Sequence, residues 1–369
     1  MDRMKSCWAV IAAVGLVLAV SARGQQLVEA RNGQKPEVQA LLSALTVEKA
    51  RTYKNMHVFP IRFSGKQAGG DWETMDAAVE SGWLKISEKE NAAVSEVHME
   101  NVSDKTIFLL SGEIVKGGKQ TRMIRQDTIL EPGNKVVVPV FCVERGRWRG
   151  GKEFGVAKQL VPNRMRRKVS EGADQSVVWD DVAASSRALG APASPTGSME
   201  EALSDGEVQS RFDEMHESLG HFSPRDTIGI AIADSRTGQV IGLEVFGRRN
   251  LFENLQGKLM EGYAADLVLS DAFTAGSKVE RAVTEKDVAE FIQRALEGAS
   301  RYEDTPGSGR GIGLTSGNLL GKGVALAQSV IHLSVQTRGP DLPVKPIVRP
   351  SLPRLEDPRR RAPYDRPIR

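Results

Sequence analysis

A cluster of polar residues near the middle of the chain combines side-chain types that could do chemistry. Glu113 and Glu144 could act as an acid/base pair, or could neutralise the cations beside them. Between them, Gly117 and Gly118 could turn backbone N–H groups toward a ligand, or could make a tight turn between strands. The cluster also holds three cationic donors, an amide that can make two hydrogen bonds, and an aromatic ring on which a ligand could stack. These are Lys119, Arg122 and Arg147, then Gln120, and finally Trp148.

This combination of residues exceeds what a turn between strands requires. We therefore interpret residues 113–122 and 144–148 as a cleft that binds an anionic small molecule. A second hypothesis is a hydrolase that uses Glu113 or Glu144 as its general base. A third is a non-catalytic envelope or interaction protein, whose basic C-terminal tail contacts a partner or an anionic surface.

Other sequence patterns with known chemistry are missing. The chain has no Gly-x-Ser-x-Gly, His-Glu-x-x-His or Cys-x-x-Cys motif. A glycine-rich stretch differs from a phosphate-binding loop, because Gly317 and Gly321 are one residue too close and a glycine follows Lys322. His216 and His221, five residues apart, would lie on different faces of a helix. We expect no metal site and no cofactor.

Residues 145–168 form the most basic part of the chain. They include nine Lys or Arg and one acid, Glu153, for a net charge of +8 over 24 residues. Such a segment is either a solvated loop or a surface for an anionic ligand. Because aromatic residues do not alternate with the basic ones, nucleic acid is not favoured as the partner.

The N-terminus resembles a processing segment. Arg3 and Lys5 precede an apolar run of 13 residues over 8–20, and small residues follow up to position 24. The run is too short to span a bilayer, which takes about 20 residues, so we expect a signal peptide over residues 1–24. The alternative is an uncleaved anchor or a buried helix. The signal predicts an exported protein, periplasmic or extracellular, with no transmembrane span after cleavage.

Cysteine content excludes an internal disulfide in such an exported chain. Once the signal peptide is removed, Cys142 is the only cysteine left. Its place in an apolar, strand-like run predicts a buried, inert thiol rather than a nucleophile.

The elements that must position the polar cluster are mainly strands. Strand-like runs follow one another between residues 83 and 144, and Pro139 in the last of them predicts a sheet edge or a bulge. Helical patterns dominate after residue 176, interrupted by a hairpin at residues 234–238. Thr284 and Asp287 form a capping box before a further helix. The glycine-rich stretch 307–323 shows no periodic order, and residues 324–335 read as the last strand.

The 40% apolar content is enough for a substantial core, so these patterns predict an α+β fold with mostly antiparallel sheets and several packed helices in one large domain. We expect a polar segment and helix over residues 25–53 and the domain itself over 54–337. The remainder, 338–369, holds eight prolines and a net charge of +5, which predicts a disordered tail.

Several motifs carry a family resemblance. The runs Gly112-Glu113 to Arg122 and Val140 to Trp148 are followed in order by Ser194-Pro195-Thr196-Gly197, the hairpin strands over 229–246, and His332-Leu333. Over residues 54–337 the chain resembles the ADP-ribosylglycohydrolase- and rhodanese-phosphatase-associated protein domain. The resemblance implies an accessory domain, and the neighbours for which the family is named imply handling of ADP-ribose-like or phosphorylated compounds.

Overall fold

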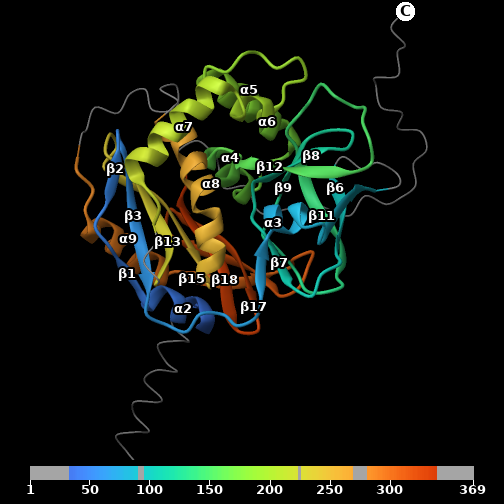
Figure 1. Cartoon of the computed structure of the whole chain (residues 1–369). Coiled ribbons are helices and arrows are strands. Elements are labelled where there is room, and N and C mark those ends of the chain that lie inside the picture. Colours follow the sequence, from blue (N-terminus) through green and yellow to red (C-terminus); the bar gives the residue numbers. More distant parts are fainter. Residues whose placement is uncertain (1–32, 90–94, 223–225, 269–280, 339–369) are drawn as a thin grey trace, which may run out of the picture.

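The computed structural model describes residues 33–89, 95–222, 226–268 and 281–338 (Figure 1). These residues form one α+β domain with antiparallel sheets, as the sequence predicts, and a single strand pair (β4 with β7) is parallel in the described part. The expected signal peptide, and the expected tail beyond Arg338, lie outside the described residues.

The largest sheet has nine strands in the order β1-β3-β13-β14-β18-β17-β16-β15, with β2 paired to β3. Its strands are β1 (Leu45–Val47), β2 (Arg51–Tyr53), β3 (Met56–Phe63), β13 (Thr227–Asp234), β14 (Gln239–Phe246), β15 (Ala299–Glu303), β16 (Arg310–Ser316), β17 (Leu319–Leu326) and β18 (Ser329–Thr337). The glycine-rich stretch 307–323, whose sequence shows no periodic order, contains β16 and part of β17. Glycines have no side chain to display the period of two by which a strand is recognised.

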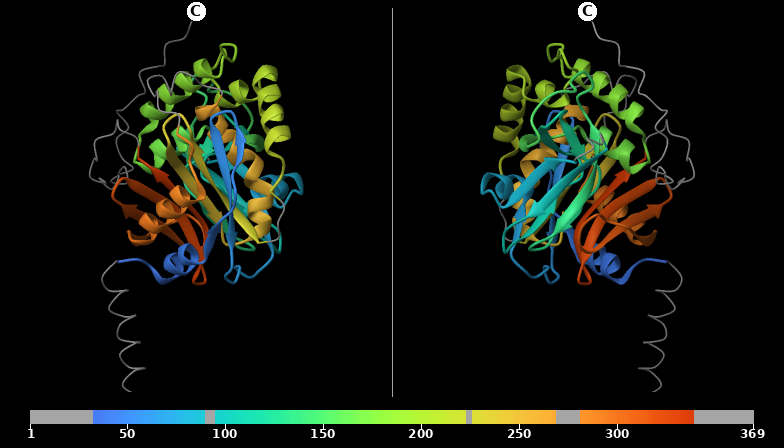
Figure 2. Two further views of the ribbon diagram at one scale, coloured as in Figure 1. Left: turned by 90° about the vertical axis from the view of Figure 1, so that its left-hand side faces the viewer. Right: turned by 90° about the vertical axis from the view of Figure 1, so that its right-hand side faces the viewer.

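Helices cover both faces of this sheet (Figure 2). On β13, Ala231 and Ala233 belong to the core that includes α2 (Pro36–Ser43) and α9 (Glu285–Leu296). Ile230 and Ile232 point to the other face and join the core that includes α8 (Arg249–Leu267). The capping box of Thr284 and Asp287 is present at the start of α9, as predicted.

A six-stranded sheet closes on itself as a small barrel beside the large sheet. Its order is β12-β8-β9-β11-β6-β5, and the end of β5 meets the residues just before β12, where Glu88 N donates to Lys152 O at 2.9 Å and Ser87 forms a bridge with Glu153. Pro139 lies where β11 changes partner from β6 to β9. The predicted sheet edge or bulge is wrong, because β11 is an inner strand and its pairings with β6 and β9 show no register shift. The strands are β5 (Leu84–Glu88), β6 (Glu96–Asn101), β8 (Glu113–Gly117), β9 (Arg122–Ile124), β11 (Lys135–Cys142) and β12 (Phe154–Leu160).

The barrel core is completed by α3 (Met75–Glu80) and by a three-stranded sheet, β10 (Thr128–Leu130), β7 (Thr106–Leu109) and β4 (Trp72–Thr74). Four helices, α4 (Asn163–Ser170), α5 (Gln175–Ala188), α6 (Met199–Leu203) and α7 (Gly206–Leu219), add to the core between barrel and large sheet. The basic segment 145–168 is thus largely β12 and α4. None of the helices described is long and apolar enough to cross a membrane.

Arg122 ties the barrel together from the inside. Its side chain is fully buried on the same face of β9 as Ile124, which belongs to the barrel core. The Nη2 atom lies 2.8 and 2.9 Å from the two carboxylate oxygens of Glu88 on β5, and Nη1 donates to the carbonyl of Glu96 at 3.2 Å. The guanidinium also lies 5.3 Å from the ring centroid of Phe154 on β12. Arg122 therefore links four strands of the barrel.

Replacing Arg122 with alanine is expected to lower the free energy of unfolding by about 3–5 kcal/mol, because it leaves the Glu88 carboxylate buried without its partner. The matched control is Arg62→Ala on β3. The Arg62 side chain is 47% exposed and pairs with Glu48 and Asp226 at the surface, so its loss should destabilise the fold much less than the loss of Arg122. Urea unfolding of both variants measures the difference, and similar losses in both would contradict the assignment of Arg122 as the internal tie.

Candidate functional site

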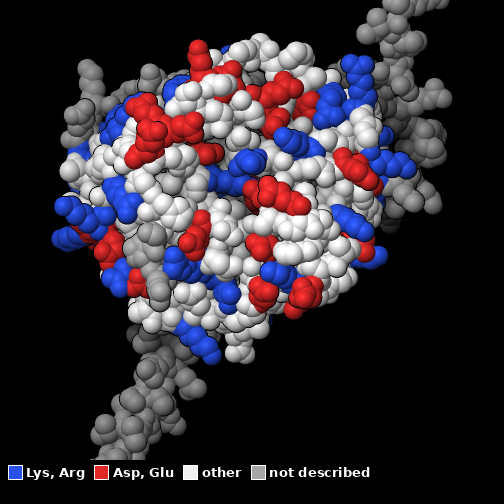
Figure 3. Space-filling model, viewed as in Figure 1, with Lys and Arg blue, Asp and Glu red and all other residues white. Residues whose placement is uncertain are grey.

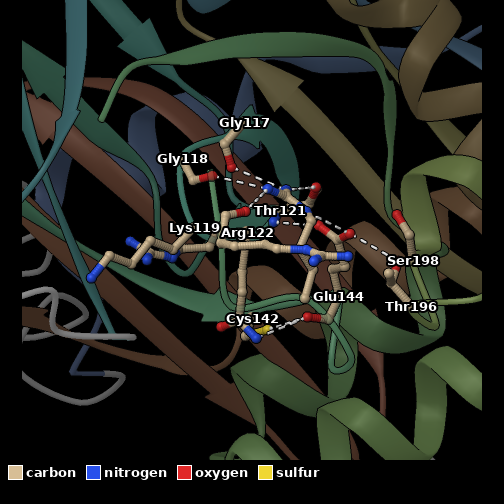
Figure 4. A network of polar contacts seen from close by, with 12 residues as sticks. Gly117, Gly118, Lys119, Thr121, Arg122, Cys142, Glu144, Thr196 and Ser198 are labelled. Atoms are coloured by element: carbon tan, nitrogen blue, oxygen red, sulfur yellow. Dashed lines mark hydrogen bonds and ion pairs between the residues drawn. The ribbon is translucent and has the colours of Figure 1, made fainter. Parts of the chain in front are cut away.

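Glu144 is the centre of a hydrogen-bonded network that holds the loop after β11 (Figure 4). Arg147 donates to its carboxylate from Nε at 2.8 Å and from Nη2 at 2.7 Å. Thr121 N and Thr196 Oγ1 donate to it at 2.8 and 2.9 Å. Burial alone would raise the pKa of Glu144, but these donors outweigh it and lower the pKa to about 2. A carboxylate this acidic is a weak general base at neutral pH.

The paired glycine takes part in the same network through its carbonyl groups. Gly117 O and Gly118 O accept hydrogen bonds from Arg147 at 3.1 and 2.9 Å, and Gly118 N donates to Glu153 O at 3.0 Å. Gln120 Nε2 donates to the carbonyl of Glu144 at 3.1 Å. These contacts therefore fix the turn between β8 and β9 against the loop after β11. They involve Gly117, Gly118, Gln120 and Arg147.

Glu113 lies apart from that network, inside the domain. Its carboxylate is fully buried, accepts a hydrogen bond from Leu110 N at 2.8 Å and pairs with Lys258 Nζ at 3.0 Å. The Lys258 ammonium also lies 2.7 Å from Asp76. Burial raises the pKa of Glu113 even though Lys258 opposes the shift.

The polar cluster of the sequence is thus divided among three places. Glu113 and Arg122 are internal, while Glu144, Gln120 and Arg147 fix the turn. Lys119 and Trp148 face outward, with Lys119 Nζ 5.3 Å from the centroid of the Trp148 ring, and Figure 4 shows Lys119 extending away from the other labelled side chains. A ligand would have to break existing ion pairs to reach Arg122 or Glu113. That the cluster binds a ligand stays a prediction.

Surface charge does not single out another site on the face shown in Figure 3, where acidic and basic side chains are interspersed. A more favourable place is a pocket with a volume of about 210 Å³. It lies where β16, β17 and β18 approach the β9–β10 loop and the C-terminal end of α4. The charged residues of its lining are Arg125, Asp127, Arg166, Glu171, Glu303, Asp304, Lys322 and His332.

The inner wall of the pocket is a buried ion network centred on Glu244. Arg166 of α4 donates to both carboxylate oxygens of Glu244, at 2.7 and 3.3 Å. Tyr263 Oη and Ser334 Oγ donate to the same carboxylate at 3.0 and 3.1 Å. His332 Nε2 is 3.0 Å from Glu244 as well. A carboxylate with this many donors is satisfied despite complete burial.

His332 connects this network to the barrel side of the pocket. Its Nδ1 atom lies 2.6 Å from Asp127 Oδ2, and Asp127 Oδ1 accepts from Ser111 N at 2.9 Å. Since each ring nitrogen faces a carboxylate, the doubly protonated imidazolium satisfies both contacts. Burial disfavours this charged form, but Asp127 and Glu244 outweigh burial and raise the pKa of His332 to about 9. Burial likewise opposes the charge on Glu244, yet Arg166 and His332 lower the pKa of that carboxyl to about 2.

Strand alternation places these side chains on one face of the large sheet. On β18, Leu333 and Val335 enter the core beneath α9, so His332, Ser334 and Gln336 point to the opposite face. Glu244 lies directly across from Ser334 on the neighbouring strand β14.

Two glycines make room for the partners. A Cβ atom at Gly112 would lie 2.7 Å from Arg166 Cγ, and one at Gly242 would lie 2.3 Å from Tyr263 Oη.

The sequence patterns did not predict this site. The signal was present in β18, where a histidine, a serine and a glutamine alternate with apolar residues, and in β14, where one glutamate interrupts an apolar run. A strand with polar residues on one face usually turns that face to water, so the pattern alone points to the surface rather than to a buried network.

The pocket offers fixed charges and hydrogen-bonding groups rather than an obvious base. Both nitrogens of His332 are already engaged. Cys142 is buried as predicted, and burial raises the pKa of its thiol. Among the residues that the structure describes, no group of three or more His, Cys, Asp or Glu is placed to hold a metal ion. The arrangement suits recognition of a polar ligand.

Raising the pH above 6.5 is expected to destabilise the fold through His332. Its pKa is about 9 in the folded chain and ordinarily 6.5, so the stabilisation is complete below pH 6.5 and is lost as the pH rises through 9. Urea unfolding across this range should show a steeper loss in the wild type than in His332→Gln. The control, exposed His98→Gln, should keep the wild-type dependence. Identical dependence in the wild type and His332→Gln would show that His332 is not held as an imidazolium.

A comparison with protein families identifies the family of the chain. The model of the ARG and Rhodanese-Phosphatase-superfamily-associated Protein domain matches residues 44–336. Neither the curated proteins nor the solved structures compared with the chain give a match. The matched segment takes in the barrel, the large sheet from Ala44 onward and every residue of the buried ion network. The chain therefore belongs to the ARG and Rhodanese-Phosphatase-superfamily-associated Protein domain family.

Proposed function

We propose that this chain binds a small sugar phosphate in the pocket beside the Glu244 network. One observation carries the proposal. The polar groups of the inner wall are hydrogen-bonded to one another, whereas two other groups of the lining, on Arg125 and Gln336, are left for a ligand. A preorganised site loses little conformational freedom when a ligand binds.

Arg125 is the group best placed for the phosphate. It follows β9, lines the pocket and is exposed, and its guanidinium lies 5.0 Å from the centroid of the Phe141 ring. In the described part of the chain no carboxylate forms an ion pair with it. A planar guanidinium held against an aromatic ring can donate two parallel hydrogen bonds to a phosphate.

The rest of the pocket favours a ligand with hydroxyl groups. Gln336 is 5% exposed; its Nε2 donates to Ser334 Oγ at 3.1 Å, and its Oε1 has no hydrogen-bond donor among the described residues. Leaving a buried acceptor unsatisfied costs about 1–3 kcal/mol, and a sugar hydroxyl would supply the missing donor. The Glu303 carboxylate, 2.6 Å from Lys322 Nζ, is a further acceptor in the lining.

The size of the pocket narrows the class of ligand. Its volume of about 210 Å³ lies below the roughly 300–1,000 Å³ of pockets for drug-sized molecules. One phosphorylated sugar is therefore favoured over a complete dinucleotide. The family is named for its association with ADP-ribosylglycohydrolases and rhodanese-phosphatase proteins, which makes phosphorylated ribose the first compound to test. We also propose that the binding takes place outside the cytoplasm, because the N-terminal sequence resembles a signal peptide.

Titration calorimetry with ribose 5-phosphate, ribose and inorganic phosphate tests the proposal. Wild-type protein should bind ribose 5-phosphate most tightly, and Arg125→Gln should weaken that binding by about tenfold or more, because a charged hydrogen bond contributes about 1.5–3 kcal/mol. The matched control is Arg187→Gln, an exposed arginine on α5 outside the pocket. It should bind like the wild type.

Two results would contradict the pocket assignment. One is no binding of any of the three compounds. The other is unchanged binding in a folded Arg125→Gln variant together with a loss in Lys119→Ala, which would place the ligand at the outward-facing end of the polar cluster instead.

A further inference from the structure

The loop over residues 145–152 has a composition unlike the mixed surface around it. It contains four cations, Arg145, Arg147, Arg149 and Lys152, and no acid. Seven of its eight residues are exposed, and the partly buried one is Arg147. Trp148 is 49% exposed, whereas the other large apolar side chain exposed in the described residues, Val102, is an isolated valine. The loop therefore combines one exposed aromatic ring with a locally uniform positive charge.

Hydrogen bonds to the body of the domain hold the loop in place. Arg147 donates to Glu144, to the carbonyls of Gly117 and Gly118, and to the carbonyl of Arg149 at 3.0 Å. At the start of the loop, Gly146 N donates to Thr196 O at 2.7 Å. With Arg147 turned inward, the next side chain, Trp148, is presented outward on a fixed base.

The exposed cations beside Trp148 are largely available for a partner. In the described part of the chain, neither Arg149 nor Lys152 forms a side-chain ion pair, and Lys119 contacts the Trp148 ring. Arg145 packs over the Trp179 ring, 5.1 Å from its centroid. Three carboxylates lie near the loop: Glu144 is paired with the inward-turned Arg147, Glu201 also acts on Arg147, and Glu153 is the residue after the loop. The exposed part of the loop therefore remains positive.

We propose that this loop docks the protein on an anionic lipid surface. Tryptophan favours the boundary between water and lipid because its ring is apolar and its N–H is polar. Each Lys or Arg near an anionic surface adds roughly a fivefold gain in partitioning. An outward-pointing loop fits a planar surface, whereas small molecules and peptides are bound in concave sites, and none of the residues 145–152 lines the pocket described above.

A nucleic acid is a poorer fit to the same loop. Single strands are bound by several aromatic side chains along a basic groove, each stacking one base. Here one aromatic ring stands alone at the tip, since Trp179 lies under Arg145 and Phe154 is buried in the barrel.

Co-sedimentation of the full chain with vesicles tests the proposal. Binding should be strong to vesicles of phosphatidylcholine and phosphatidylglycerol in equal amounts, and weak to phosphatidylcholine alone. Reversing the charges in Arg149→Glu with Lys152→Glu should lower partitioning by at least about tenfold, and Trp148→Ala should lower it as well. Quenching of tryptophan fluorescence by brominated lipid should be reduced in Trp148→Ala.

Matched controls separate the loop from general charge and hydrophobicity. Val102→Ala removes the other exposed apolar side chain, and Lys286→Glu reverses a cation on α9 whose side chain is 85% exposed. Both should partition like the wild type. Equal partitioning of the Arg149 and Lys152 variant and the wild type would overturn the proposal. So would binding to a single-stranded oligonucleotide or an acidic peptide in the absence of any vesicle binding.

Discussion

The structure depends on a single buried carboxylate, Glu244. It lies in the middle of the large sheet, and its partners come from α4, α8 and β18, so the sheet and two helices meet at one charge. His332 extends the connection to Asp127 in the loop between β9 and β10. A buried carboxylate without partners would strongly destabilise the fold. The packing of these elements against one another is therefore constrained electrostatically as well as by the apolar core.

Two other buried ion pairs also connect different elements of the fold. Arg122 with Glu88, and Lys258 with Glu113, are buried pairs whose partners lie on different elements. Such pairs add less to stability than an apolar replacement would, but they permit one arrangement of the elements and penalise others. In this domain, buried charges define how barrel, helices and sheet fit together.

Local patterns made the fold class, the hairpin at residues 234–238 and the capping box at Thr284 predictable. These features depend on residues that are near in sequence. The site was not predictable in the same way, because its contacts are not local. His332 and Asp127 are 205 residues apart, and Glu244 and Arg166 are 78 apart. The same limit explains Arg122, where the sequence shows a cation beside a paired glycine and gives no sign of Glu88, 34 residues earlier.

The order of strands in the large sheet has a consequence for how the chain is made. The barrel is an insertion between β3 and β13, which are neighbours in the sheet. The last described strand, β18, lies between β14 and β17 rather than at an edge. During synthesis, β14 therefore has one open edge of unpaired backbone N–H and C=O groups until β18 is available to pair with it. Pairing across the middle of the sheet must wait for β18, and until then the open edge of β14 is a place where chaperones could bind or chains could aggregate.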